Sequence, residues 1–326
     1  SLSATPTITE AGGVLVYTAN LTQAPLTDLT ITLSNGSVIV IAAGQTTGTV
    51  NVPLAPNDTV YNDPTQINVT VTGTTGGSGI IVTPPTTPAV TQVTDTVDTT
   101  TVTLTAGANV TEGGQITYTA TLTNPAQTPV TITLSNGSII TIEAGNTTGS
   151  VNVPTPANDV YNNGSTVTTT ITGATGGNFE SLVPNPAPAV TTITDSIDAT
   201  TVTLTASPTV SESGDITYTA TITDAQGNPV KVTGTDVVVT RANGEKVTIP
   251  VGQSGASINV PAPNDVYNGA APVKTEITGT SGGNFENLGS NKTPVETTVT
   301  DKADDTTVTL TASPSTVEGG PITYTA

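Results

Sequence analysis

The sequence contains no cysteine, no histidine and no tryptophan among its 326 residues. The lack of cysteine excludes disulfide bonds and thiolate metal sites, and the lack of histidine removes the most common catalytic base and transition-metal ligand. Any metal site would therefore hold a hard cation through oxygen ligands. Because no base and nucleophile can be paired, we expect no enzymatic activity.

Positively charged side chains are also scarce, with 6 Lys and Arg against 25 Asp and Glu and a formal net charge of −19. All six lie after residue 230. Because Lys and Arg neutralise phosphate, nucleic acid and anionic membranes are not expected partners. No apolar run approaches the about 18 residues of a membrane-spanning helix. No signal peptide is recognisable, so we expect no direct membrane insertion.

A repeat of about one hundred residues organises the chain. The tetrapeptide (V/T)YTA and the downstream NDTVY or NDVY recur at matching offsets, with the tyrosines of the tetrapeptide at Tyr17, Tyr118, Tyr218 and Tyr324. Internal repetition decides the architecture. We predict three complete repeats and the opening strands of a fourth, at residues 1–97, 98–197, 198–303 and 304–326. The third repeat carries six extra residues in a longer hairpin, VTGTDVVVTRANGEKV.

Apolar residues alternate with period two, and turn residues interrupt them every eight to twelve residues. This pattern predicts an all-β fold of tandem immunoglobulin-like, seven-stranded β-sandwiches arranged as an elongated rod. In the second repeat the strands are expected at 101–106, 116–123, 130–135, 138–143, 149–153, 166–172 and 189–194. The SNGS sequence at 135–138 predicts a hairpin with a type I′ turn.

Along the second predicted strand, Ile116, Tyr118, Ala120 and Leu122 should face the core, with threonines facing water. The four tyrosines of the repeated tetrapeptide are expected to be buried. Such a core is poor in aromatic residues and therefore offers little apolar area to bury. Additional stabilisation from outside the core would be useful.

Acidic residues gather where the repeats meet. If the strands run alternately up and down, the loops after the first, third and fifth strands share one end of a domain with the exit linker, and they face the sixth loop of the next repeat. Two carboxylates about 4 Å apart repel by roughly 4 kcal/mol at an effective dielectric near 20. With no bases nearby, a divalent cation is the available counter-charge. Ca²⁺ accepts six to eight oxygens in flexible geometry.

The hypothesis therefore assigns calcium ligands at three junctions. At the first they are Glu10, Asp58, Asp95, Asp98, Asn178 and Glu180; at the second Glu112, Asp159, Asp195, Asp198, Asn284 and Glu286; at the third Glu212, Asp265, Asp301 and Asp304.

Three simpler interpretations stay open. Tyr161 in NDVY also fits a tyrosine corner, in which its hydroxyl bonds back to nearby backbone. Glu112, which precedes Gly-Gly, could be an ordinary turn residue. Asp95 and Asp98 could simply solvate a linker.

Several stretches resemble the repeats of giant bacterial biofilm adhesins, which are repeats-in-toxin proteins exported by type I secretion and include the large adhesion protein of pseudomonads. They are VTLTASPTVSESGDITYTATITD, TITLSNGSIITIEAGNTTGSVNVP, ITGATGGNFESL and TDTVDTTTVTLTA. The resemblance covers nearly the whole chain. It implies immunoglobulin-like extender modules on the cell surface, rigidified by calcium, that hold a distal ligand-binding region away from the outer membrane. The third repeat departs from it through its longer hairpin and its basic residues.

The expected function is a structural extender of an extracellular bacterial surface adhesin that presents distal domains for attachment and biofilm formation. Its expected partners are the neighbouring repeats of the same chain, with a surface or glycan ligand bound elsewhere in the full-length protein. The alternative is a ligand-binding module that uses Thr-rich strand faces for glycan or ice, such as the row Thr101, Thr103 and Thr105.

Overall fold

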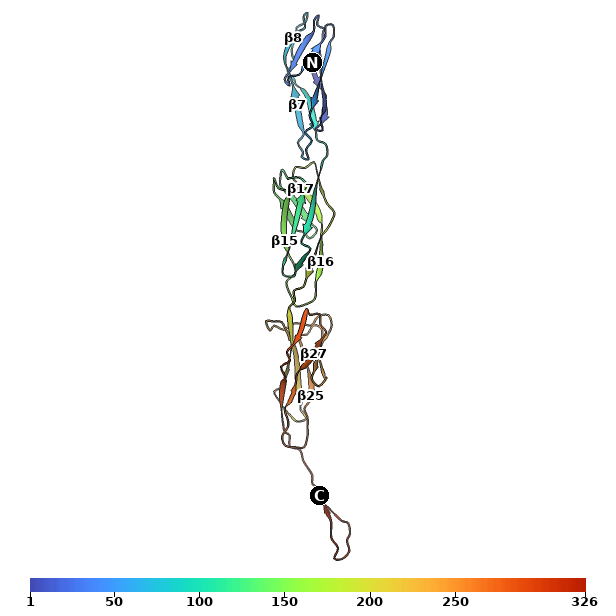
Figure 1. The fold of residues 1–326 in the computed structure, drawn as a ribbon, viewed down its shortest axis with the longest axis vertical. Helices are drawn as coiled ribbons and strands as arrows, with labels where there is room; N and C mark the ends of the chain where they lie inside the picture. Colours follow the sequence, from blue (N-terminus) through green and yellow to red (C-terminus); the bar gives the residue numbers. More distant parts are fainter. The chain divides into compact units, whose positions relative to one another are not determined.

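The computed structural model describes residues 1–326, and it confirms the prediction of an all-β chain. Figure 1 shows strands joined by turns and loops and no helix. Accordingly, no helix is long and apolar enough to cross a membrane.

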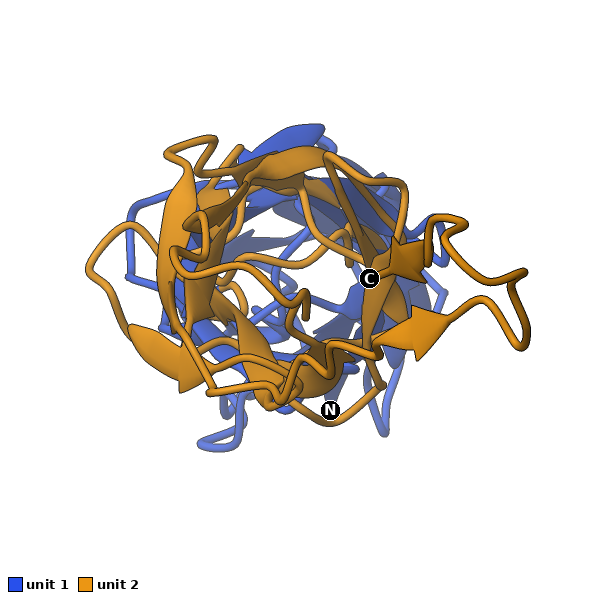
Figure 2. Ribbon diagram, turned by 90° about the horizontal axis from the view of Figure 1, so that it is seen from below, with its two compact units in different colours: residues 1–110, 115–154, 166–192 blue, residues 111–114, 155–165, 193–326 orange.

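The chain divides into two compact units, coloured separately in Figure 2. Unit 1 comprises residues 1–110, 115–154 and 166–192. Unit 2 comprises residues 111–114, 155–165 and 193–326. Unit 1 therefore holds the first predicted repeat and most of the second, and unit 2 holds the third together with three segments that belong to the second by sequence.

The first predicted repeat contains nine strands: β1 (Leu2–Ala4), β2 (Thr7–Thr9), β3 (Gly13–Asn20), β4 (Leu29–Leu33), β5 (Val38–Ile41), β6 (Thr47–Leu54), β7 (Thr65–Val69), β8 (Val71–Gly76) and β9 (Ala89–Thr94). They form three sheets with the orders β1-β3-β6, β5-β4-β8 and β2-β9-β7. Most neighbours are antiparallel, whereas β2 and β9 are parallel.

The second predicted repeat follows the same plan with β10 (Thr99–Ala106), β11 (Asn109–Thr111), β12 (Gln115–Leu122), β13 (Val130–Leu134), β14 (Ile139–Ile142), β15 (Thr148–Pro154), β16 (Ser165–Thr169), β17 (Ile171–Gly176), β18 (Ser181–Pro184) and β19 (Ala189–Thr194). Within unit 1, these strands form a sheet of order β15-β12-β10-β18 and a sheet of order β14-β13-β17.

The third predicted repeat contains β20 (Ala199–Ala206), β21 (Thr209–Ser211), β22 (Asp215–Thr223), β23 (Val237–Arg241), β24 (Lys246–Ile249), β25 (Gly255–Pro261), β26 (Val273–Thr275), β27 (Ile277–Ser281), β28 (Asn287–Ser290) and β29 (Val295–Thr300). Its sheets have the orders β25-β22-β20-β28, β24-β23-β27 and β21-β29-β26. A final hairpin pairs β30 (Thr311–Ala312) with β31 (Tyr324–Thr325).

The core lies where the sequence places it. Ile116, Tyr118, Ala120 and Leu122 of β12 are all buried, as the period-two pattern predicts. Tyr17 and Tyr218 are buried at the matching positions of β3 and β22, whereas the expectation is wrong for Tyr324, whose exposed fraction is 64%. Tyr324 lies in the two-stranded hairpin, which has no second sheet to cover it.

The strand prediction for the second repeat is incomplete in a physically explicable way. The predicted strand 166–172 is two strands, β16 and β17, separated at Thr170. The register of β13 against β17 shifts between Thr133 and Leu134, and Thr170 donates its N–H to Ser135 Oγ. Two short strands, β11 and β18, were not predicted, and β18 pairs with β10 in parallel.

The predicted hairpin at 135–138 is confirmed, but the type I′ turn is wrong. Such a turn requires positive φ at both central residues. Gly137 has φ of +83°, whereas Asn136 is not among the residues of positive φ. Gly137 N–H donates to Leu134 O, and Leu134 N–H donates to Ser138 O. These bonds define a type I turn followed by a glycine bulge.

Candidate metal centres at two joints

Acidic side chains and two loops come together at each of two places, which we call the first and second joints. The first joint comprises Glu10 and residues 57–63, 94–98 and 178–180, all within unit 1. The second comprises Glu112 and residues 158–163, 194–198 and 284–286, all within unit 2.

At the first joint, Glu10 follows directly after β2, which pairs with β9. The N–H of Glu10 donates to Thr94 O at 3.0 Å, and its Oε1 accepts the N–H of Thr96 at 3.2 Å. Glu10 is only 5% exposed. A residue fixed at both its backbone and its side chain in this way is a positioned carboxylate, not a freely solvated turn residue.

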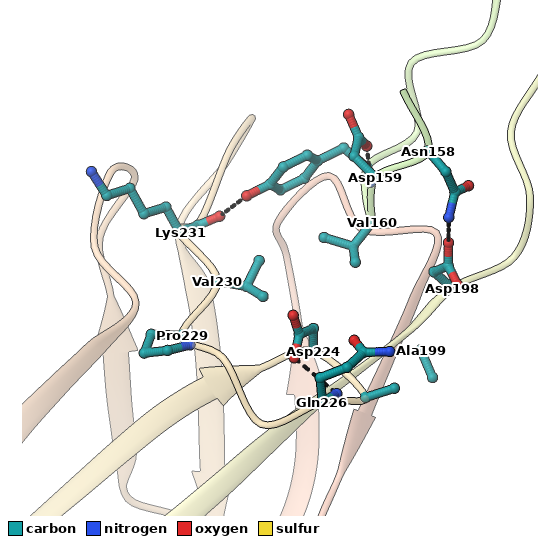
Figure 3. A pocket seen from close by; sticks show the side chains of 12 residues that line it. Asn158, Asp159, Val160, Asp198, Ala199, Asp224, Gln226, Pro229, Val230 and Lys231 are labelled. Carbon is teal, nitrogen blue, oxygen red and sulfur yellow. Dashed lines mark hydrogen bonds between the residues drawn. The ribbon is translucent and has the colours of Figure 1, made fainter. Parts of the chain in front are cut away.

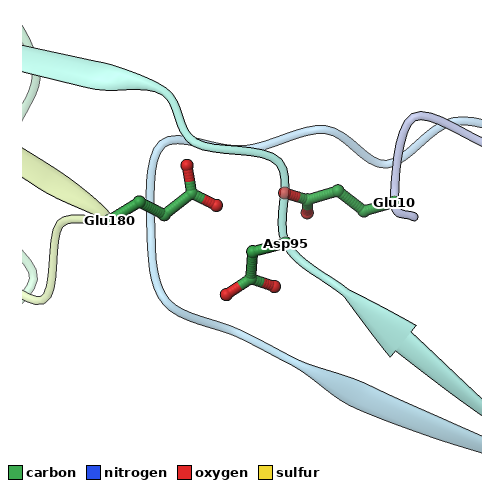
Figure 4. Close-up of side chains that lie close together, drawn as sticks. All are labelled: Glu10, Asp95 and Glu180. Carbon is green, nitrogen blue, oxygen red and sulfur yellow. The ribbon is translucent and has the colours of Figure 1, made fainter.

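Two further carboxylates meet Glu10. Asp95 follows β9, and its Oδ2 accepts the N–H of Asp63 at 3.2 Å. Glu180 precedes β18 in the next predicted repeat, and its Oε2 accepts the N–H of Asp98 at 2.6 Å. One carboxylate oxygen from each of the three residues lies within 4.8 Å of the others. Figure 4 shows the three side chains gathered from three separate segments, with the carboxylates of Glu10 and Glu180 facing each other.

The second joint repeats this arrangement with Glu112, Asp195 and Glu286, again within 4.8 Å. Glu112 is 6% exposed. The three carboxylates accept the N–H groups of Ser196 at 3.2 Å, Asn163 at 3.1 Å and Asp198 at 2.6 Å, respectively. We call Glu10, Asp95 and Glu180 the first triad, and Glu112, Asp195 and Glu286 the second triad.

In the second triad, each carboxylate divides its two oxygens between different tasks. Glu112 Oε1, Asp195 Oδ2 and Glu286 Oε2 accept backbone hydrogen bonds. The other oxygen of each is buried and has no hydrogen-bond partner. In the first triad, Glu180 Oε1 is likewise buried and unpartnered. A buried carboxylate oxygen without a partner is costly, and these four oxygens, at two matching places, are free to accept a cation or another donor.

The pKa of one glutamate in each triad is raised, which agrees with burial and with crowding of like charges. Burial raises the pKa of Glu10, and contacts with Glu180 and Asp95 raise it further, although the N–H of Thr96 opposes the rise. Burial likewise raises the pKa of Glu286, with added contributions from Glu112 and Asp198. Glu10 and Glu286 therefore hold a proton more readily than a free glutamate does, and a nearby cation would favour their ionised form.

A second set of contacts locks the two loops of each joint together without charge. At the first joint, the Tyr61 and Phe179 rings stack with centroids 5.6 Å apart. Asn62 N–H donates to Asn178 O at 3.0 Å, and Asn62 Nδ2 donates to Phe179 O at 2.8 Å. Asn178 Nδ2 in turn donates a hydrogen bond to Asn62 O at 3.3 Å. The two loops thus pair through a short β-bridge between Tyr61 and Phe179. We call this set of stacking and hydrogen-bond contacts the loop lock.

The second joint has the same lock. Tyr161 stacks on Phe285 at 5.6 Å, Asn162 N–H donates to Asn284 O at 3.1 Å, and Asn284 Nδ2 donates to Asn162 O at 2.8 Å. The Tyr161 hydroxyl donates to Lys231 O at 2.7 Å, in the third predicted repeat. The tyrosine-corner interpretation is therefore wrong for Tyr161, because its hydroxyl bonds across the joint. Burial raises the pKa of Tyr161, and Asp159 adds to the rise.

Glycine is required in the GGNFE loop of each joint, directly before the asparagine and phenylalanine that contact the other loop. Gly177 has φ of +82°, and a Cβ there would collide with the Phe179 ring. Gly283 has φ of +71° and would meet Phe285 at 2.6 Å. The GGNFE sequence thus combines a tight turn, an aromatic anchor and a carboxylate.

Several predicted ligands lie at the joints but outside the triads. Asp58 accepts a hydrogen bond from the Thr96 hydroxyl. Asp159 accepts the N–H of Tyr161 at 2.7 Å and so caps its own turn. Asp98 contributes its N–H to Glu180, and the Asn178 side chain belongs to the loop lock.

At the second joint, Asp198 Oδ2 accepts a bond from Asn158 Nδ2 at 2.6 Å, and the Asn284 side chain belongs to the lock. At the third predicted junction, Glu212 is buried and accepts the N–H of Lys302 at 3.2 Å, and Asp301 accepts the N–H of Gly269 at 2.6 Å. Asp265 caps Tyr267 at 2.8 Å, and Asp304 is exposed. Neither Glu212 nor Asp301 belongs to a cluster of three carboxylates like those of the first two joints.

A cavity of about 540 Å³ opens beside the second joint (Figure 3). Its walls include Val160, Tyr161, Asp198 and the turn that contains Asp224 and Lys231. The Asp224 carboxylate accepts two bonds from Asn228 and one from Gln226, and the Asn228 side chain is the main cause of its lowered pKa. The acidic residues of the cavity are thus largely engaged in hydrogen bonds within its walls.

Sequence reasoning missed the loop lock itself. Its signal is present, because Asn62 and Asn162 both follow the tyrosine of NDTVY or NDVY, and Phe179 and Phe285 share the GGNFE loop. Only the fold reveals that these two short sequences touch.

Comparison with known proteins identifies a recurring domain. The family model described as LapA domain matches residues 1–96, 98–196 and 198–302. A search of curated proteins finds no match.

Proposed function

Because the chain belongs to the LapA domain family, which indicates an adhesin-related bacterial surface protein, we propose that it is the stalk of such an adhesin. In this proposal each repeat is an immunoglobulin-like β-sandwich and serves as a structural spacer without enzymatic activity. The repeats follow one another as a rod that holds distal binding domains away from the cell for attachment and biofilm formation. The three successive matches support a tandem array.

The observation that carries the proposal is the composition of the triads. In each, two carboxylates come from one predicted repeat and the third comes from the loop of the next. An ion bound by all three would tie consecutive repeats together. Each joint, already held by its loop contacts, would then lose its remaining hinge freedom when the ion binds.

Calcium suits these triads better than other divalent cations. Only hard oxygen donors are available, and Ca²⁺ takes six to eight of them in flexible geometry, whereas Mg²⁺ demands a stricter octahedron and retains its water. Carboxylates supply three donors, and nearby carbonyl groups and water would complete the shell. Sites of extracellular modules bind calcium with dissociation constants of roughly 0.1 to 1 mM.

Sites with such affinities would bind calcium outside the cell, and the proposal therefore includes an extracellular location on the bacterial cell surface. Inside the calcium-poor cell the contacts between the loops would hold the joints alone, and the joints would stiffen further once exported. The absence of cysteine is compatible with export of the unfolded chain by type I secretion, as in repeats-in-toxin adhesins. At a free calcium concentration of 100 times the dissociation constant, each site stabilises by about 2.7 kcal/mol.

The alternative function, in which Thr-rich faces bind glycan or ice, gains no support. Thr103 and Thr105 donate their hydroxyls to Thr121 O and Thr119 O on the neighbouring strand, both at 3.3 Å. These hydroxyls are therefore partly used within the sheet.

Small-angle scattering with calcium and then with chelator tests the proposal. We expect chelator to shorten the maximum dimension and to broaden the range of shapes, because both joints regain hinge freedom. The Glu112→Gln variant should lose this response at one joint only. Glu143→Gln, which makes the same change at an exposed residue outside the joints, serves as the matched control.

Identical scattering profiles in calcium and chelator would contradict the calcium-stiffened stalk. An equal response of Glu112→Gln and Glu143→Gln would show that the triads are not the calcium sites.

A further inference from the structure

Five Asn-Gly pairs occur in the chain, at residues 35–36, 136–137, 163–164, 243–244 and 268–269. In such a pair the glycine nitrogen can attack the asparagine side-chain amide, because glycine has no side chain to crowd the approach. The reaction requires that nitrogen to be free and the local backbone to be mobile. Local hydrogen bonding therefore decides which pairs react.

In four of the five pairs the glycine N–H is already donated. Gly36 bonds Leu33 O at 3.0 Å, Gly137 bonds Leu134 O at 2.9 Å, Gly244 bonds Arg241 O at 2.9 Å, and Gly269 bonds Asp301 Oδ2 at 2.6 Å. No hydrogen bond holds the N–H of Gly164, and both Asn163 and Gly164 are exposed. The pair at the second joint is therefore the one left open to attack.

We propose that Asn163 is a site of spontaneous deamidation. The nitrogen of Gly164 forms a bond to Asn163 Cγ, and the Cγ–Nδ2 bond breaks. The displaced nitrogen leaves as ammonia with the proton of the Gly164 amide, and a cyclic succinimide remains. Water then opens this ring and produces aspartate or isoaspartate at position 163. No oxidant, reductant or enzyme is needed.

The first joint shows what the product would resemble. There the matching position is Asp63, whose N–H donates to Asp95 as that of Asn163 donates to Asp195. The next residue is Pro64, whose ring nitrogen cannot make this attack. The first joint thus already carries the carboxylate, in a form that cannot cyclise through its neighbour.

The surroundings of the two positions differ in charge. At the first joint, Asp63 Oδ1 accepts the hydroxyl of Thr59 at 3.4 Å. At the second, Asn163 Nδ2 donates to Asp159 Oδ2 at 2.9 Å. Deamidation replaces this donor by a second carboxylate, so a hydrogen bond becomes a like-charge contact beside Asp195.

This change weakens the second joint in the absence of a divalent cation. The effect of calcium on the product rests on the proposed function, whereas the reaction itself does not. Because the bond from Asn163 to Asp159 must open before Gly164 can attack, an ion that rigidifies the joint slows the reaction.

Peptide mapping by mass spectrometry tests the proposal on the full chain, incubated in mildly alkaline buffer with chelator. Cleavage at acidic residues gives fragments that separate the five sites. We expect Asn163 to convert at least about fivefold faster than Asn136, because Asn136 lies in a hydrogen-bonded hairpin turn. Gly164→Pro, which introduces the residue found at the matching position of the first joint, should abolish conversion at 163 and leave the rate at 136 unchanged.

Equal rates at Asn163 and Asn136, or persistent conversion in Gly164→Pro, would overturn the assignment. Asn163→Asp should lower the melting temperature in chelator, and an unchanged temperature would overturn the effect on the joint. If calcium fails to slow a fast reaction at Asn163, the modification site stands and calcium binding at this joint is refuted.

Discussion

Replacing Glu286 by glutamine should have opposite effects with and without calcium. Glu286 Oε2 accepts the N–H of Asp198, and its Oε1 is buried and unpartnered. A glutamine keeps a carbonyl oxygen for Asp198 and nearly the same shape. The substitution therefore removes charge while leaving the loop lock of Tyr161 and Phe285 in place.

Without calcium, the variant should be more stable than the parent chain. One oxygen from each carboxylate of the second triad lies within 4.8 Å of the others, and at that distance two unit charges repel by about 3.5 kcal/mol at an effective dielectric near 20. Glu286 faces two such partners, Glu112 and Asp195. Solvent, salt and the raised pKa of Glu286 reduce this repulsion, so we expect a net gain of about 1 to 2 kcal/mol.

With calcium, the order should reverse. An ion present at 100 times its dissociation constant stabilises the parent by about 2.7 kcal/mol. If loss of one carboxylate weakens binding about a hundredfold, the ion stabilises the variant by only about 0.4 kcal/mol. The variant thus forfeits about 2.3 kcal/mol of calcium stabilisation, which offsets the gain seen in chelator.

Urea unfolding in chelator and in calcium measures both effects, with hydrogen exchange at residues 158–163 to report on the joint itself. Glu143→Gln is the control and should behave as the parent does in both buffers. A variant Glu286→Gln that is less stable than the parent in chelator would refute the charge-crowding argument. An undiminished calcium response would refute the assignment of Glu286 as a ligand.

Three further predictions concern pH, the loop lock and the core. In chelator, the free energy of unfolding should fall as pH rises above 4.5, because the raised pKa values of Glu10 and Glu286 make the folded chain bind more protons than the unfolded chain in that window. Urea unfolding at a series of pH values measures this dependence. A free energy of unfolding that rises with pH in this window would contradict the prediction. Phe179→Ala should lower the stability of the first joint by about 2 to 4 kcal/mol in either buffer, since it deletes a buried ring stacked on Tyr61. Hydrogen exchange of the backbone amides at residues 57–63 measures this loss, and an unchanged exchange rate there would contradict the prediction. Arg241 is 1% exposed, its Nε has no hydrogen-bond partner, and it occupies a position that leucine fills in the other repeats. Arg241→Leu should therefore leave the free energy of unfolding unchanged or raise it by about 1 to 3 kcal/mol. A lower melting temperature of the variant would contradict this prediction.

The convergence of the triads could be predicted because strand number fixes where each loop emerges. Glu112 lies after the first predicted strand, Asp195 after the last and Glu286 in the sixth loop of the next repeat. Counting strand directions was enough to bring these three to one end. The additional strands β11 and β18 are short and leave the long strands in place, so they did not disturb the count.

The hydrogen-bonding role of each side chain could not be predicted, because residues at matching positions of similar sequences make different hydrogen bonds. NDTVY at the first joint has one residue more than NDVY, so Asp58 occupies the place of Asn158, and Thr59 that of Asp159. Tyr61 N–H bonds the Thr59 hydroxyl, whereas Tyr161 N–H bonds Asp159. Sequence spacing alone cannot tell which oxygen caps a turn and which faces the neighbouring repeat.

The stacking of Tyr61 on Phe179 escaped prediction for another reason. The two residues lie more than one hundred positions apart and in different repeats, and each could equally well belong to its own core. Burial patterns with period two apply to strands, and these residues lie in loops.

Calorimetric titration of calcium into the full chain tests the central claim most directly. We predict that the parent binds ions at two triad sites, that Glu112→Gln and Glu10→Gln each abolish or strongly weaken one of them, and that the double variant loses both while Glu143→Gln loses neither. Unchanged stoichiometry and affinity in the double variant would contradict the claim that these carboxylates hold calcium at the joints.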